Sequence, residues 1–308
     1  MTAASDATTD LTDLDFTAYA DSRRAMVDDY LAAYMARRAD GEGFDKLKEA
    51  MSYSLLGGGK RFRPVLAIAG CEAVGGDCEK VLPVAAAIEM LHTVSLIHDD
   101  LPAMDNDDLR RHRATNHKVF GEALAILAGD ALITEAYLLL SAPDTAPPAT
   151  AMAVIHEIAH ATGLSGMAGG QSLDMLTAPD EIDEALTRQT HHAKTARFIA
   201  ASAAAGALMG GADPETVAAL RTFGENVGQA FQIVDDILNV TGDAARIGKS
   251  VGSDANAGKA TYPAVHGLPE SRRLAAEHID AALAAVQHLG EAAEPLRAAA
   301  RFVIERDR

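Results

Sequence analysis

Two clusters of acidic residues, far apart in the chain, carry oxygen groups of the kind that bind divalent cations. The first places five carboxylates within ten positions, from Asp99 to Asp108, directly after an apolar segment that ends at His98. Carboxylates packed this tightly repel one another unless a cation neutralises them, and oxygen-only ligands suit Mg²⁺. Asp99 and Asp105 are six residues apart, so they converge only if a helix ends between them. Pro102 favours such an end, because the residue before a proline avoids the helical region.

The second cluster consists of Asp235, Asp236 and Asn239, inside the apolar run 230–240. Asp235 and Asn239 are four residues apart and share one face of a helix. Burying carboxylates there without partners would be costly, and a bound metal would remove that cost. Each cluster taken alone is also what an ordinary acidic helix end looks like, so the basic residues of the chain must decide between the two interpretations.

The basic residues are informative because the chain is strongly acidic, with 27 Lys and Arg against 44 Asp and Glu and a net charge of −17. Lys60 and Arg63 bracket a predicted helix start after a run of three glycines. Backbone N–H groups at such a start, together with a guanidinium and an ammonium, form an anion site suited to a diphosphate. Each of these residues alone could be a surface cation. Further basic groups near acidic or glycine-rich segments are Arg110, Arg111, Lys194, Lys249 and Lys259.

Taken together, the two sets of residues predict a reaction type. Two acidic clusters can hold metal ions around one diphosphate, and the basic residues complete its neutralisation, which makes the diphosphate a good leaving group. Phosphoryl transfer is disfavoured because the sequence has no P-loop or kinase signature. Departure of a diphosphate from carbon in an apolar helical protein indicates allylic prenyl chemistry or terpene cyclisation.

The elements that must position these residues are predicted to be helices. Ala and Leu dominate, aromatic residues make up 5%, and there is no Trp, so the fold class is all-α. We expect a single domain over residues 1–308, a bundle of more than four helices, with residues 1–15 as a disordered tail. The predicted helices are 16–38, a short one ending at 55, 63–75, 80–98, 115–141, 149–163, 181–209, 214–241 and 270–306, the last with a break near Gly290.

Several classes of protein are disfavoured. The acidic surface argues against a nucleic-acid partner. The only cysteines, Cys71 and Cys78, form no metal or redox motif, which fits a cytoplasmic location. No charge-free run of 18 apolar residues occurs, and the acidic N-terminus does not resemble a signal peptide, so no stable membrane anchor is expected.

The sequence resembles the trans-isoprenyl diphosphate synthases, or polyprenyl synthetases, over roughly residues 55–268. Both aspartate motifs of that family match: Asp99-Asp100-x4-Asp105 with Asp108-Leu109-Arg110-Arg111, and Gln232-Ile233-Val234-Asp235-Asp236. The resemblance further rests on Gly59 to Pro64, Gly169-Gly170-Gln171-x2-Asp174, Lys194-Thr195, Lys249 and Lys259-x-Thr261-Tyr262-Pro263. It implies an all-α bundle around a deep central cavity, a homodimer, and condensation of isopentenyl diphosphate with an allylic diphosphate (dimethylallyl, geranyl or farnesyl).

The resemblance also implies a role for each matching residue. About three Mg²⁺ ions would bind Asp99, Asp105 and Asp235, with Asp100 and Asp236 assisting catalysis. The allylic diphosphate would bind Arg110, Lys194, Lys249 and Lys259. Isopentenyl diphosphate would bind Lys60, Arg63, His92 and Arg111. The remaining substrate contacts would be Thr195 and Gln232, at the reacting centre, with Gln171 and Asp174.

Two positions depart from the family pattern. Asn239 stands where an aspartate is usual, so the second motif has less charge. His112 stands where a glycine commonly follows the arginine pair, and the sequence offers no physical account of that change.

Product length should depend on the helix before Asp99. Ser95, Val94 and Leu91 precede Asp99 by four, five and eight residues, and farnesyl-forming members often place an aromatic at this level. Because Ser95 and Val94 are small, we expect geranylgeranyl diphosphate as the product. The alternatives are a farnesyl diphosphate synthase, a class I terpene cyclase and a noncatalytic partner subunit.

Overall fold

The computed structural model describes residues 14–38, 43–241 and 261–305, and within these ranges the chain is helical apart from one small hairpin. The all-α prediction is confirmed. The strands of the hairpin are β1 (Leu109–Arg110) and β2 (Arg113–Ala114). The helices are α1 (Phe16–Arg37), α2 (Asp45–Leu55), α3 (Phe62–Glu72), α4 (Cys78–Asp99), α5 (Asn116–Phe120), α6 (Glu122–Leu140), α7 (Pro148–Thr162), α8 (Met167–Leu176), η2 (Pro179–Glu181), α9 (Glu184–His191), η3 (His192–Ala196), α10 (Arg197–Met209), α11 (Pro214–Thr241), α14 (Tyr262–His266), α15 (Leu268–Ala285), η4 (Gln287–Ala293) and α16 (Glu294–Glu305).

Most predicted helices are found, and the differences have local causes. The segment predicted as one helix over 115–141 is two, because Gly121 adopts a φ of 83° between α5 and α6. Helix α8 was not predicted, since its two glycines hide a helical pattern. The expected break near Gly290 is present, with non-helical backbone angles at that residue. Of the predicted N-terminal tail, residues 1–13 lie outside the described ranges, whereas Asp15 caps α1 by accepting hydrogen bonds from the backbone of Thr17 and Ala18.

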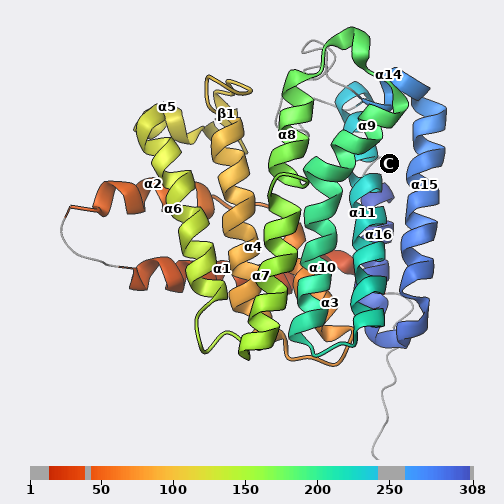
Figure 1. Ribbon diagram of the computed structural model, residues 1–308, viewed down its shortest axis with the longest axis horizontal. Coiled ribbons are helices and arrows are strands. Elements are labelled where there is room, and N and C mark those ends of the chain that lie inside the picture. Colours follow the sequence, from red (N-terminus) through yellow and green to blue (C-terminus); the bar gives the residue numbers. More distant parts are fainter. Residues whose placement is uncertain (1–13, 39–42, 242–260, 306–308) are drawn as a thin grey trace, which may run out of the picture.

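Helix α10 occupies the middle of the bundle, where it packs against α3, α4, α7 and α11 (Figure 1). Its residues from Phe198 to Ala207 are all buried, and most of them are alanine. Small side chains let the backbones approach closely: a Cβ on Gly206 would lie 1.9 Å from the carbonyl oxygen of Ala67 on α3. The prediction that the alanine-rich segment is central is therefore confirmed.

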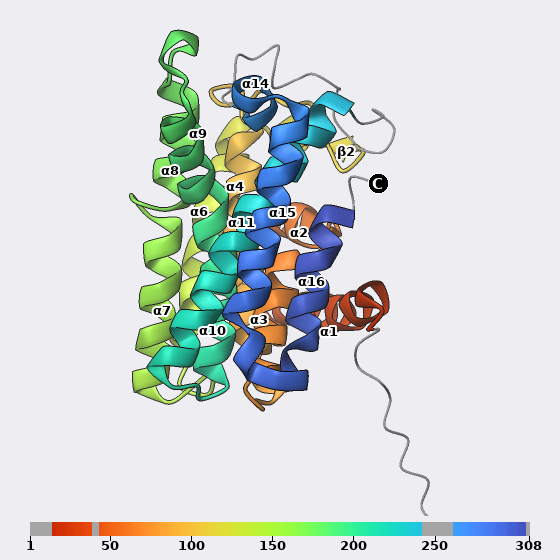
Figure 2. The same cartoon turned by 90° about the vertical axis from the view of Figure 1, so that its right-hand side faces the viewer.

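The core consists of two hydrophobic clusters, and helices α3 and α10 contribute residues to both. The first cluster also contains residues of α1, α2, α4, α6 and α7, and the second contains residues of α11, α15 and α16. Helix α1 crosses the lower part of the bundle at a steep angle to the other long helices (Figure 2). Two of these helices, α4 and α6, are long and apolar enough to span a membrane by length and composition alone. Within their most apolar windows, 67% of α4 and 39% of α6 is buried inside the bundle.

The hairpin after the first acidic cluster gives a physical account of the departure expected at His112. Leu109 pairs with Ala114 and Arg110 with Arg113, so Arg111 and His112 form a two-residue turn. Their φ angles are 53° and 62°. Turns with positive φ at both central positions favour Asn-Gly, because only glycine adopts such angles without steric cost. His112 therefore occupies a strained position that glycine would relieve.

Candidate active site

A cavity of about 650 Å³ is lined by residues of both aspartate motifs. Asp99, at the end of α4, and Asp235, on α11, both line it. The residues that line it are Arg63, Leu91, His92, Val94, Ser95, Leu96, His98, Asp99, Met104, Ile133, Tyr137, Thr162, Met167, Ala168, Gln171, Lys194, Thr195, Phe231, Gln232 and Asp235.

The first acidic motif folds back on itself as predicted. Helix α4 ends at Asp99, and the loop after it returns so that the backbone N–H of Asp105 donates to the carbonyl oxygen of Asp99 over 2.8 Å. The pKa of Asp99 is raised to about 6, mainly by burial and in smaller part by the negative charge of Asp105, against the opposing charge of Lys194. Burial thus disfavours the charged form of Asp99 in the free protein, and a cation bound beside it would relieve that cost.

The second acidic motif divides into two roles. Asp235 faces the cavity, whereas Asp236 is 3% exposed and turned into the protein. Asp236 accepts hydrogen bonds from the backbone N–H of Tyr262, at 2.9 Å, and from the side chain of Gln232, at 3.1 Å. It thus ties α11 to the start of α14. Of the two carboxylates in the motif, only Asp235 is placed to meet a ligand in the cavity.

Gln232 connects Asp236 to the opposite wall of the cavity. Its side-chain oxygen accepts a hydrogen bond from the hydroxyl of Thr195 over 3.0 Å, while its nitrogen donates to Asp236. Thr195 lies in η3, a single π-helical turn between α9 and α10. Such turns occur often at functional sites, because the extra residue redirects side chains. The network fixes Thr195 and Gln232 side by side at the cavity wall.

Lys194, in the same turn, contacts α8. Its ammonium lies 2.5 Å from a carboxylate oxygen of Asp174. A Cβ on Gly170 would lie 2.2 Å from the backbone nitrogen of Lys194, so only glycine permits this approach. Gln171, the residue after Gly170, is 8% exposed and lines the cavity. Its side-chain amide has no hydrogen-bond partner among the described residues. A buried amide in this state is satisfied by a bound ligand or by water.

Two residues with basic side chains also line the cavity: Arg63, at the start of α3, and His92, on α4. Burial lowers the pKa of Arg63 to about 10, and its guanidinium carbon is 5.5 Å from the ring centroid of Phe198. Burial also lowers the pKa of His92 well below its usual value, and the charges of Arg63 and Arg111 lower it further. His92 is thus neutral at pH 7 beside two arginines, and this region carries positive charge that an anion would neutralise. Lys60, at the helix start, is exposed.

Arg61, between Lys60 and Arg63, has a different role. It is 2% exposed and has a φ of 49°. Its guanidinium lies 2.6 Å from Glu89 and 2.8 Å from Asp28, and it donates to the carbonyl oxygen of Leu55. Arg61 thus joins α1, α2, α3 and α4 and is not among the residues predicted to bind a substrate.

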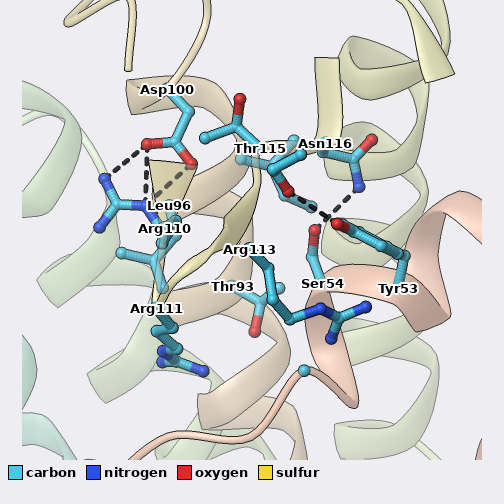
Figure 3. A pocket seen from close by; sticks show the side chains of 13 residues that line it. Tyr53, Ser54, Thr93, Leu96, Asp100, Arg110, Arg111, Arg113, Thr115 and Asn116 are labelled. Atoms are coloured by element: carbon cyan, nitrogen blue, oxygen red, sulfur yellow. Dashed lines mark hydrogen bonds and ion pairs between the residues drawn. The ribbon is translucent and has the colours of Figure 1, made fainter. Parts of the chain in front are cut away.

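Asp100 and Arg110 contact each other rather than the large cavity. Asp100 is 2% exposed, and the guanidinium of Arg110 donates to both of its oxygens over 2.8 Å (Figure 3). The two residues line a smaller pocket together with Arg111, Arg113 and Tyr53. In this structure Asp100 orients Arg110 and the hairpin that follows it.

The acidic groups fit Mg²⁺ that is shared with a substrate. Among the residues that the structure describes, no three His, Cys, Asp or Glu side chains are close enough together to hold a metal alone. Asp99 and Asp235 instead line one cavity from two different helices, α4 and α11. Mg²⁺ usually takes one or two carboxylates and completes its shell with water and substrate phosphates, so this divided set of donors suits it.

The structure also locates the remaining predicted residues. Leu91, Val94 and Ser95 all line the cavity, below Asp99 on α4. Lys249 and Lys259 lie outside the described residues. Several further lining residues were not predicted from the sequence, because helical periodicity marks a buried face and does not say whether a cavity or a neighbouring helix covers it. They are Met104, Ile133, Tyr137, Thr162, Met167 and Phe231.

Comparison with known proteins gives one consistent answer. The family model described as Polyprenyl synthetase matches residues 44–296. The chain is 47% identical over 266 residues to a farnesyl diphosphate synthase of Geobacillus stearothermophilus, covering 86% of this chain and 89% of that protein. It is 39% identical over 299 residues to a geranylgeranyl diphosphate synthase of Cyanophora paradoxa, covering 96% and 98%. Among solved structures, an FPP/GFPP synthase from Zymomonas mobilis superimposes with a TM-score of 0.83 at 34% identity, covering 94% of this chain and 99% of that one.

Proposed function

Because this chain belongs to the polyprenyl synthetase family and is a short-chain prenyltransferase, we propose that its main product is geranylgeranyl diphosphate. The reaction is the condensation of isopentenyl diphosphate with an allylic diphosphate. The proposed product length rests on the residues of α4 that line the cavity below Asp99. Val94 and Ser95 line the cavity there and neither is aromatic. The hydroxyl of Ser95 donates to the carbonyl oxygen of His92 over 2.8 Å, so the wall stays open and apolar at this level.

The two charged regions of the cavity suggest where each substrate binds. The allylic diphosphate would lie between Asp99 and Asp235, held by about three Mg²⁺ ions and by Lys194. When bound, Mg²⁺ would neutralise the diphosphate and make it a better leaving group. Isopentenyl diphosphate would lie against Arg63, His92 and Arg111, where burial lowers the pKa of both arginines. The carbons to be joined would then meet between the two diphosphates.

The protein's own groups would control the fate of the allylic cation. The bond from carbon to the diphosphate breaks, the double bond of isopentenyl diphosphate attacks the cation, and the released diphosphate accepts the proton that leaves. Thr195 and Gln232 offer an oxygen and an amide dipole beside this centre, fixed by their mutual hydrogen bond. Apolar residues such as Phe231 and Met167 would exclude water, which would otherwise capture the cation.

Product analysis tests the proposal directly. The enzyme would be incubated with isopentenyl diphosphate, Mg²⁺ and, separately, dimethylallyl, geranyl or farnesyl diphosphate. We expect geranylgeranyl diphosphate from all three starters. Formation of farnesyl diphosphate only, with no elongation of a farnesyl starter, would favour the alternative suggested by the Geobacillus relative. A matched pair of variants adds a second test: Val94→Phe should shorten the product, whereas Val94→Leu should not.

We also propose that the chain is a cytoplasmic homodimer. Helices α6 and α7 follow one another in the chain, and both expose large apolar side chains, with Leu138 54% and Met152 64% exposed. Apolar patches of this kind mark protein interfaces, and a second copy of the chain would cover them. Light scattering should give twice the monomer mass, and Leu138→Glu should produce monomers. A monomeric wild type would refute the dimer without affecting the proposed reaction.

The proposed cytoplasmic location rests on the cysteines. Cys71 and Cys78 are free thiols, which fit a reducing compartment.

A further inference from the structure

The turn of the hairpin formed by β1 and β2 carries Arg111, which belongs to the proposed isopentenyl diphosphate site. Arg111 forms no ion pair with a residue that the structure describes. Its guanidinium lies against the backbone of Gly59, so closely that a Cβ there would overlap it. The position of Arg111 therefore depends on how the backbone of the turn is held.

The turn needs support from outside the hairpin. Arg111 and His112 have φ angles of 53° and 62°. Residues other than glycine keep such angles only where the surrounding structure imposes them. Each strand is only two residues long, so the hairpin itself provides few hydrogen bonds. Contacts with the neighbouring helices must therefore hold both strands.

The first strand is held by an ion pair. Arg110, on β1, donates hydrogen bonds to both carboxylate oxygens of Asp100, directly after the end of α4. Arg113, at the paired position on β2, has no carboxylate partner among the described residues. A contact of another kind must therefore hold the second strand.

The second strand is held by Tyr53, near the end of α2. The hydroxyl of Tyr53 donates to the carbonyl oxygen of Ala114 over 2.8 Å. Its ring centroid lies 4.3 Å from the guanidinium carbon of Arg113, which is the geometry of a cation–π contact. Figure 3 shows Tyr53 and Arg113 at one side of the smaller pocket, and Arg110 with Asp100 at the other. The two anchors thus hold the hairpin on different strands, with the turn between them.

The ring of Tyr53 is itself fixed by its neighbours. Phe120, at the end of α5, meets it edge to face, with ring centroids 5.4 Å apart and an interplanar angle of 78°. The residue after Tyr53, Ser54, accepts a hydrogen bond from the side chain of Asn116 over 2.8 Å. Because these contacts join α2 to α5 and leave β2 itself untouched, the strand depends on Tyr53.

We infer that Tyr53 is a positioning residue, which holds β2 and thereby sets where Arg111 meets isopentenyl diphosphate. The inference rests on the proposed isopentenyl site. Tyr53 lines the smaller pocket and is not among the residues that line the large cavity, so it acts through the hairpin and does not touch the reacting atoms. It adds α2 to the elements that determine how this substrate binds.

The test compares Tyr53→Phe and Tyr53→Leu with the wild type in steady-state kinetics, varying each substrate with the other saturating. Tyr53→Phe keeps the ring and should raise the KM for isopentenyl diphosphate about threefold, the effect of one neutral hydrogen bond. Tyr53→Leu also removes the cation–π contact and should raise it about tenfold. The KM for the allylic substrate and kcat should stay nearly unchanged. Glu49→Ala, an exposed position on the same helix, is the control.

A double variant shows whether Tyr53 acts through Arg111. Arg111→Ala alone should raise the KM for isopentenyl diphosphate, and adding Tyr53→Leu to it should cause no further rise. A further rise, or an equal rise in both KM values for Tyr53→Leu alone, would mean that Tyr53 supports the fold in general, and the inference is overturned.

The remaining outcomes separate the inference from the proposed site. If Arg111→Ala raises the KM for isopentenyl diphosphate and Tyr53→Leu does not, the site stands and the inference about Tyr53 is overturned. If Arg111→Ala leaves this KM unchanged, the proposed site is wrong and the inference falls with it. Should Tyr53→Leu fail to fold, Tyr53→Phe alone must raise the KM for isopentenyl diphosphate.

Discussion

Replacing Gly59 with alanine should weaken the binding of isopentenyl diphosphate and leave that of the allylic substrate nearly unchanged. A Cβ on residue 59 would lie 2.4–2.5 Å from three atoms of the Arg111 guanidinium, so this side chain would have to move. Arg111 belongs to the proposed isopentenyl site, whereas the proposed allylic site lies across the cavity at Asp99 and Asp235. The substitution is thus a way to displace one substrate's arginine without removing it.

The size of the expected effect follows from the loss of the hydrogen bond between Arg111 and the diphosphate. A hydrogen bond to a charged group contributes about 1.5–3 kcal/mol, which corresponds to about a ten- to hundredfold increase in the KM for isopentenyl diphosphate. Alanine at residue 59 also has a backbone cost, because the φ of Gly59 is 130°. That cost affects stability and must be separated from the effect on Arg111.

Gly58 provides the matched control. Its φ is also positive, at 80°, but a Cβ there would have no atom within 4 Å. Gly58→Ala therefore introduces backbone strain, about 1–3 kcal/mol, in the same loop without displacing Arg111. Steady-state kinetics would be measured for both variants, varying each substrate with the other saturating. The reasoning is refuted if both variants raise the KM for isopentenyl diphosphate equally, or if Gly59→Ala raises both KM values alike. The double variant with Arg111→Ala should show no further loss beyond Arg111→Ala alone.

Three further predictions concern other parts of the site. His112→Gly should relieve strain in the hairpin turn and raise the melting temperature by about 2 °C; a lower melting temperature in calorimetry would contradict this account. Because burial raises the pKa of Asp99 to about 6, protons should compete with Mg²⁺ below that pH. The Mg²⁺ concentration for half-maximal activity should therefore rise as pH falls from about 7.5 to about 5.5, and a flat profile would exclude Asp99 as a ligand. Asn239→Asp adds a carboxylate one turn from Asp235 and should tighten Mg²⁺ binding, measured by titration of activity; unchanged binding would show that residue 239 does not reach the metal.

The sequence predicted the fold well wherever local signals decide. Pro102 predicted the end of α4 and the meeting of Asp99 with Asp105, and alanine content predicted the central place of α10. The prediction of helix boundaries failed where a glycine can either end a helix or lie inside one. Gly121 separates two helices, whereas Gly170 lies inside α8 and marks the close approach of another backbone. The residue type is the same, and only the tertiary contact distinguishes the two cases.

The sequence could not tell which of two neighbouring charged residues meets a ligand. Adjacent residues on a helix point about 100° apart, so one faces the cavity and the other a packed neighbour. In the first motif the buried residue is Asp100, whose partner Arg110 is ten residues away. In the second it is Asp236, whose backbone partner Tyr262 is 26 residues away. Such partners belong to other elements, so periodicity alone cannot assign them.

Asp99, Asp235 and Arg63 thus each lie within two residues of a charge that the protein itself neutralises, and this arrangement has an energetic consequence. Asp100 and Asp236 are buried with their partners, whereas Asp99 has a raised pKa and Arg63 a lowered one. The charged forms of Asp99 and Arg63 are therefore both disfavoured in the free enzyme. Cations bound near Asp99 and an anion bound near Arg63 would each relieve one of these costs. Ligands that bind only the folded state stabilise it. The melting temperature should therefore rise more with Mg²⁺ and diphosphate together than with either alone.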